Sequence, residues 1–312
     1  MPVPSTDQRV LNAQGMVLRT LAYFDIFDHP LKLDELQRFG AGDGSDPEEL
    51  LLALIDLETK GLVHRCGKYW GAKECAGSVR LREEAEQRAR ARMPKALVMS
   101  RRIARFPFVR AVFLSGSMSK GCLAKDGDID FFVVTRPGRL WVARTLLILY
   151  KKIFLLNSRK DFCVNYFLDT EHLTVEDRNR FTATEVVTLI PTYGNGTTEA
   201  FFERNAWAFR MFPGARTPRS HEVATGDTRS KSILEKLLGG RFGDRLDGWC
   251  MQLTWYRWKR KFDHFDARTF ELALRTRTYV SKHHPRNFQK RVLDGFQERI
   301  VALEARLGTP LP

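Results

Sequence analysis

Residues 114–134 decide the fold: they contain LSGSMSKG at 114–121 and DGDIDFFVV at 126–134. The apolar run that ends at Gly116 predicts a strand, and Ser117 then opens a short helix that extends to Leu123. Because glycine has no side chain, a phosphate can approach the backbone closely at this junction. The serine hydroxyl and the first N–H groups of the helix can then face an anion.

Two aspartates, Asp128 and Asp130, begin the next apolar strand, which we predict over residues 128–135. Side chains alternate across a strand, so both carboxylates share one face while Ile129 and Phe131 take the other. Two close carboxylates repel each other unless a cation lies between them, and oxygen ligands beside a phosphate favour Mg²⁺. The plainer alternative is a helix-capping serine followed by two solvated aspartates.

The pair Gly116-Ser117, followed by Asp128-x-Asp130 on an apolar strand, resembles the signature of the DNA polymerase β-type nucleotidyltransferase superfamily. The resemblance covers roughly residues 105–170. It implies an α/β (α+β) nucleotidyltransferase core with a mixed sheet.

The resemblance also implies roles for the motif residues. Asp128 and Asp130 would be catalytic and would bind Mg²⁺, with Mn²⁺ as the alternative ion. The substrate would be a nucleoside triphosphate, with ATP as the default donor. The residues expected to bind its phosphates are Gly116, Ser117, Ser119 and Lys120.

A third carboxylate on a neighbouring strand normally completes this signature, and here the sequence departs from it. The strand predicted over residues 163–168 carries Asn165 at that place, and an amide cannot accept a proton at neutral pH. Asp161 and Asp169 share its parity along the strand. We expect Asn165 to occupy the third position and Asp161 to be the better substitute acid, with Asp169 or Glu185 next.

The organisation of the chain follows from the patterns on either side of this core. Residues 1–78 predict three helices and a hairpin, an order that resembles a winged helix-turn-helix domain. An arginine-rich connector helix over 79–104 follows. The nucleotidyltransferase core is expected over 105–172. Residues 173–312 are expected to form a helical C-terminal domain, including one helix over 230–262.

Composition limits the class of protein. With 43% hydrophobic residues and no apolar window that would span a bilayer, the chain predicts a globular protein without a membrane partner. Its five cysteines are odd in number and scattered, which disfavours a disulfide framework and a structural zinc site. We therefore expect a soluble protein of the reducing cytoplasm.

Charge is distributed unevenly along the chain. Residues 1–75 hold 8 Lys/Arg against 12 Asp/Glu, a net charge of −4, whereas residues 76–312 hold 43 against 25, a net of +18. A DNA-reading domain should itself be basic, so DNA binding by the N-terminal unit is disfavoured. The basic excess favours a phosphorylated or nucleic-acid acceptor.

Two functions remain open on this evidence. The first is Mg²⁺-dependent transfer of a nucleoside monophosphate to a small molecule, a protein hydroxyl or an RNA end, with release of pyrophosphate. The second is a nucleotide-sensing regulator, catalytically weak or inactive, that binds nucleic acid or a protein partner. The missing third acid supports the second function.

Overall fold

The computed structural model of the protein describes residues 6–41, 46–158, 160–194, 196–221 and 228–311. The chain begins with helices α1, α2 and α3, followed by a two-stranded hairpin, β1–β2, and the long helix α4. Their bounds are Thr6–Asp25, Leu33–Phe39, Pro47–Thr59, His64–Cys66, Tyr69–Gly71 and Ala76–Ala104. This order of three helices, hairpin and long helix is the one that the sequence predicts, whereas a winged-helix identity stays a prediction.

A six-stranded mixed sheet forms the centre of the molecule, in the order β6-β3-β4-β5-β8-β7. Strands β4 and β5 are parallel, and the other neighbouring pairs are antiparallel. The strand bounds are β3 Val109–Ser115, β4 Asp130–Thr135, β5 Cys163–Asp169, β6 Ile190–Tyr193, β7 Thr276–Arg277 and β8 Val280–Lys282. The mixed sheet agrees with the expected α/β class.

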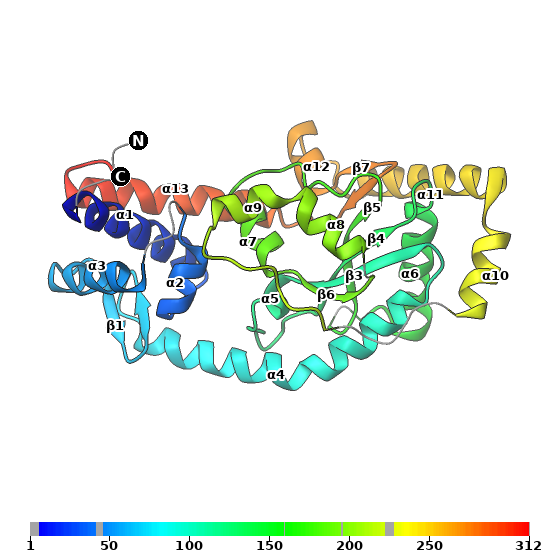
Figure 1. The fold of residues 1–312 in the computed structure, drawn as a ribbon. Helices are drawn as coiled ribbons and strands as arrows, with labels where there is room; N and C mark the ends of the chain where they lie inside the picture. Colours follow the sequence, from blue (N-terminus) through cyan, green and yellow to red (C-terminus); the bar gives the residue numbers. More distant parts are fainter. Residues whose placement is uncertain (1–5, 42–45, 159, 195, 222–227, 312) are drawn as a thin grey trace.

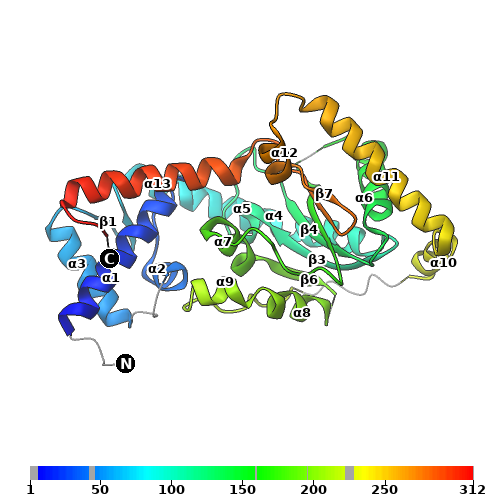
Figure 2. The ribbon, with the colours of Figure 1, turned by 90° about the horizontal axis from the view of Figure 1, so that it is seen from above.

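Helices cover both faces of this sheet (Figures 1 and 2). Phe113 and Phe132 face the side of α7, α8 and α9, whereas Val112 and Phe131 face the side of α4, α6 and α11. The helix bounds are α6 Leu140–Phe154, α7 Arg180–Thr188, α8 Thr197–Arg204, α9 Ala206–Met211 and α11 Gly240–Lys261. We call the side that carries Phe113 and Phe132 the α7 face.

The region after residue 173 is not helical throughout, and that expectation is wrong. It supplies three short strands, β6, β7 and β8. β6 pairs with β3 and β8 with β5, partners that lie far away in sequence, and β7 pairs with the adjacent β8. The single helix expected over 230–262 is two helices, α10 (Arg229–Leu237) and α11. Leu238 and Gly239 lie between them, and Gly240, with φ of +57°, begins α11.

The N-terminal unit packs against the centre of the molecule. Arg180 at the start of α7 donates to the Thr20 hydroxyl and to the Phe39 carbonyl, both at 3.1 Å. The last helix, α13 (Phe288–Leu307), returns along α1, where Arg299 pairs with Asp25 at 2.8 Å (Figure 1). Helices α7 and α13 therefore join the N-terminal unit to the sheet.

One disulfide joins β1 to the residue before α4. Cys66 and Cys75 are bonded, so the expectation that the cysteines form no disulfides is wrong for this pair. The hairpin reverses the chain, which brings two cysteines nine positions apart to a Cα–Cα separation of 6.1 Å. Cys122, Cys163 and Cys250 are free thiols.

Candidate active site

Position 116 requires glycine for two reasons, its backbone conformation and the close approach of a neighbouring side chain. Its φ is +64°, a conformation that other residues adopt only with strain. A Cβ added there would lie 2.4 Å from Oδ2 of Asp130, because β3 and β4 pair Ser115 with Asp130. The missing side chain therefore leaves room for a carboxylate on the adjacent strand to lie against the backbone.

The short helix α5 (Gly116–Ser119) follows at once and is shorter than the predicted helix to Leu123. Ser117 is exposed at its beginning, where the first N–H groups of a helix have no partner within it. Ser119 is buried, and its hydroxyl donates to the Gly116 carbonyl at 3.0 Å. Ser117 is thus the serine available to a ligand, whereas the Ser119 hydroxyl stabilises the turn.

Lys120 lies beside the same backbone. Its Nζ donates to the Gly116 carbonyl at 3.0 Å and to Oε1 of Glu185 at 2.7 Å. Glu185 comes from α7, a helix that the sequence places about 65 positions later. The lysine that the sequence expects near a triphosphate is therefore at the junction, and it is paired with a carboxylate from another element.

Asp128 and Asp130 differ in setting. Asp130 opens β4, whereas Asp128 precedes the strand. The pKa of Asp130 is raised to about 6, mainly by burial. The nearby charges of Asp128 and Glu185 also raise it, whereas a hydrogen bond with the Cys163 thiol and the charge of Lys120 lower it. The carboxylates of Asp128, Asp130 and Glu185 act on one another here, which is an environment that a cation would stabilise.

Asn165 lies next to Asp130, on the neighbouring strand. Its Nδ2 donates to Oδ1 of Asp130 at 2.9 Å. The register of β4 and β5 shifts between the pairs Phe131–Val164 and Phe132–Tyr166, so Asn165 is the extra residue of a β-bulge. Alternation from Cys163, which pairs with Asp130, already places Asn165 on the face of Asp130, and the bulge changes the faces of the residues that follow.

The same bulge removes Asp169 from the list of substitute acids. Every side chain after Asn165 shifts to the opposite face relative to strict alternation, so parity no longer connects residues 165 and 169. Asp169 pairs with Thr135 at the far end of β4 and accepts hydrogen bonds from the Glu171 and His172 amides. It caps a turn, and the expectation that it could lie near Asn165 is wrong.

Asp161 and Glu185, the other substitutes, are placed differently. Asp161 lies in the turn before β5 and pairs with Arg92 of α4. Glu185 is close enough to Asp130 to raise its pKa. The structure therefore brings Glu185 to the site, although the sequence ranks it below Asp161. Asp161 instead forms an ion pair with Arg92 of α4.

Cys163 is the neighbour that the sequence analysis missed. It pairs with Asp130 across β4 and β5, and burial raises the pKa of its thiol above the usual range. Cys163 lies two residues before Asn165, and alternation along the strand places the two side chains on the same face. That spacing could have indicated Cys163 as a member of the site. No sequence pattern indicates that Arg92 pairs with Asp161, because Arg92 lies on a helix 69 residues before that aspartate.

The site has donors that fit a divalent cation and a phosphate. Asp128 and Asp130 offer carboxylate oxygens, and the space against Gly116 would be filled by any other residue's Cβ. Among residues 6–41, 46–158, 160–194, 196–221 and 228–311, no three His, Cys, Asp or Glu side chains cluster as metal ligands. A metal at this site would therefore need ligands from a substrate or from water.

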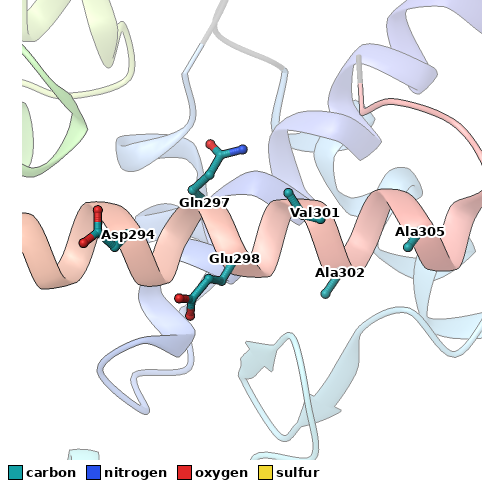
Figure 3. A pocket seen from close by; sticks show the side chains of 6 residues that line it. All are labelled: Asp294, Gln297, Glu298, Val301, Ala302 and Ala305. Carbon is teal, nitrogen blue, oxygen red and sulfur yellow. The ribbon is translucent and has the colours of Figure 1, made fainter.

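A surface depression lies elsewhere, on α13. It holds about 540 Å³, and its lining residues all belong to α13: Asp294, Gln297, Glu298, Val301, Ala302 and Ala305 (Figure 3). None of the motif residues lines it. A hollow lined by one helix offers few converging polar groups, so we place the candidate site at Gly116 and Asp130 instead.

Comparison with known proteins agrees with this placement. No curated protein and no solved structure matches the chain. In the part of the chain that the structure describes, no helix is both long and apolar enough to cross a bilayer. Residues 99–183 match the family model of the nucleotidyltransferase domain, a span that includes Gly116, Asp130 and Asn165. The chain therefore contains a nucleotidyltransferase domain, consistent with the polymerase β-type superfamily that its motif resembles.

Proposed function

We propose that the protein is a Mg²⁺-dependent nucleotidyltransferase that moves a nucleoside monophosphate from an NTP, with ATP as the default donor, to an acceptor and releases pyrophosphate. One observation carries the proposal: the Asp130 carboxylate lies against the backbone of Gly116, at the start of the short helix α5. This juxtaposition puts anion-binding N–H groups beside a metal-binding carboxylate.

The residues have separable tasks in this reaction. Asp128 and Asp130 would hold the metal, which supplies charge neutralisation for the displacement at phosphorus. The amides at the start of α5 and the Ser117 hydroxyl would bind the terminal phosphates. Lys120 would exchange its bond to Glu185 for a phosphate oxygen, since a triphosphate carries more negative charge than one carboxylate.

The acceptor hydroxyl needs a base, and Asn165 cannot be one. Of the two substitutes still available, Glu185 is favoured by its effect on the pKa of Asp130, whereas Asp161 is paired with Arg92. Moving Lys120 onto the triphosphate would release the Glu185 carboxylate at the moment when a base is required. Glu185 is therefore our candidate for the base, with Asp161 second.

The second candidate function is a nucleotide-sensing regulator of little or no transferase activity. The Asn165–Asp130 hydrogen bond favours it, because the amide stabilises the carboxylate without a metal. The N-terminal unit would then transmit the nucleotide state through α7, on which Arg180 and Glu185 lie. We infer a protein-binding or intramolecular role for that unit, because Glu48, which is exposed, and Glu49 lie in the first turn of α3 and would repel DNA.

Labelled NTPs separate these functions. The full-length protein is incubated with each of the four NTPs, Mg²⁺ or Mn²⁺, and a cell extract as the source of acceptor. Transfer of label that is lost in Asp128→Ala supports the transferase. Tight NTP binding without transfer, in the presence of extract, supports the regulator. Transfer that survives in both Asp128→Ala and Asp130→Ala would remove the site assignment altogether.

A further inference from the structure

Helices α10 and α11 form one edge of the molecule, at the end opposite the N-terminal unit (Figures 1 and 2). One face of α11 is buried and packs against α6 through Gly243, Asp247, Cys250 and Trp258. The other side is solvent-exposed. We call the exposed side chains of α10 and α11 the outer face, and its composition differs from that of an ordinary solvated helix.

Large apolar side chains run along the outer face. On α11 they recur at intervals of seven, four and three residues, which places them in one stripe. Their exposed fractions are Phe242 63%, Trp249 60%, Leu253 44% and Tyr256 65%. The stripe continues on α10 with Ile233 51%, Leu234 42% and Leu237 67%. Contiguous exposed apolar surface of this kind marks an interaction site.

The acidic residues of the two helices are paired with groups of the core, although the Asp244 side chain itself stays 64% exposed. Glu235 pairs with Arg110 at 2.8 Å, Asp244 with Arg139 at 2.6 Å, and Asp247 accepts from the Val142 amide at 2.8 Å. The exposed cations, by contrast, surround the stripe. They are Arg229, Lys236, Arg241, Arg245, Arg257, Lys259, Arg260 and Lys261. The outer face is therefore both apolar and cationic, which selects a partner that is apolar and anionic.

We propose that the outer face of α10 and α11 docks on the surface of an anionic lipid bilayer. The apolar stripe would enter the boundary between headgroups and acyl chains, and the surrounding cations would contact lipid phosphates. Aliphatic Ile233, Leu234 and Leu253 favour a bilayer over nucleic acid, because bases stack on aromatic rings and gain little from aliphatic side chains. Trp249 and Tyr256 suit the interface, where one end of the ring is dry and the other wet.

This docking differs from the expectation of no membrane partner, which rests on the lack of a spanning segment. A helix that lies in the plane of the interface needs no spanning length, only one apolar face and a charged margin. The core already holds α11 in place, so membrane binding would not need to fold it. The inference does not depend on the proposed transferase activity.

Vesicle sedimentation with the full-length protein tests the proposal. The probes are phosphatidylcholine vesicles with and without phosphatidylglycerol. We expect the protein to pellet with the anionic vesicles and to be released by high salt. The double variant Trp249→Ser/Leu253→Ser should lose most of this binding. Arg257→Ala and Arg260→Ala should each weaken it about fivefold, the effect of one surface cation.

Leu52→Ser is the matched control, because Leu52 of α3 is as exposed as Trp249, at 60%. It should pellet like the wild type, and thermal melting should show every variant folded. Three results would overturn the proposal: no pelleting of the wild type with anionic vesicles, pelleting of the double variant equal to wild type, or a wild-type dimer in light scattering that the double variant dissociates. Binding to RNA but not to vesicles, lost in the double variant, would assign the outer face to nucleic acid instead.

Discussion

Replacing Gly116 by alanine tests whether the site is built as described, and Gly121 provides a matched control. Both glycines have positive φ, +64° and +70°. A Cβ at Gly121 meets no atom within 4 Å, whereas one at Gly116 lies 2.4 Å from the Asp130 carboxylate. The two variants therefore share the backbone strain and differ in the displaced carboxylate.

The expected magnitudes follow from these two effects. Backbone strain at a positive φ costs about 1–2 kcal/mol, so Gly121→Ala should lower the free energy of unfolding by that amount. In Gly116→Ala the Asp130 carboxylate must also move away from Asn165, whose amide donates to it at 2.9 Å. Loss of a hydrogen bond to a charged group adds about 1.5–3 kcal/mol, for a total of about 2.5–5 kcal/mol.

Urea denaturation measures the stability of both variants, and equilibrium dialysis with labelled ATP and Mg²⁺ measures their nucleotide affinity. We expect Gly116→Ala to lose affinity at temperatures where it is still folded, and Gly121→Ala to keep it. Equal losses of stability in the two variants would show that Asp130 does not constrain Gly116. Wild-type affinity in folded Gly116→Ala would refute the placement of the phosphates against this backbone.

Three further predictions concern neighbouring groups. Asn165→Asp replaces a hydrogen bond to Asp130 with like charges, so urea denaturation should show a loss of about 1–3 kcal/mol without metal, part of which Mg²⁺ restores; the same loss with and without Mg²⁺ would contradict a metal there. Glu185→Gln should slow transfer roughly 10²–10⁴-fold if Glu185 is the base, whereas Asp161→Asn should leave the rate near wild type, and the reverse order in steady-state kinetics would exchange their roles. Burial lowers the pKa of His284 to about 4, so the unfolded chain binds its proton first: stability should be complete above about pH 6.5 and fall by roughly 3 kcal/mol toward pH 4, and a pH series in urea should be flatter for His284→Gln.

The local elements were accessible to sequence reasoning because their signals are local. Asp46 caps α3, with its carboxylate accepting from the Glu48 amide, and Pro47 occupies the first turn, an order of residues that is typical of a helix start. Strand β3 and the end of β4 coincide with apolar runs. Gly116 was also identified from its place between a strand and a helix, although the carboxylate that makes glycine necessary there comes from another strand.

The pairing of the short strands was harder to predict from the sequence. Strands β6, β7 and β8 have two to four residues, too few to show a period of two, and Pro191 interrupts the first of them. β6 forms on the edge that β3 offers and β8 on the edge that β5 offers, and β7 then pairs with β8. No local window contains the two distant pairings. The sequence predicts a helical C-terminal domain over 173–312, and β7 and β8 are among the places where that prediction is wrong.

The sequence by itself determined the chemistry of this protein: the Gly116-Ser117 junction, the two aspartates and the amide at position 165 are properties of residue order. The tertiary structure alone decided which groups meet. A single extra residue in β5 reverses the faces of the side chains after it, which removes Asp169 from the site. Packing of α7 on the sheet brings Glu185 to Lys120. Both depend on contacts between segments far apart in the chain, and alternation along one strand cannot predict them.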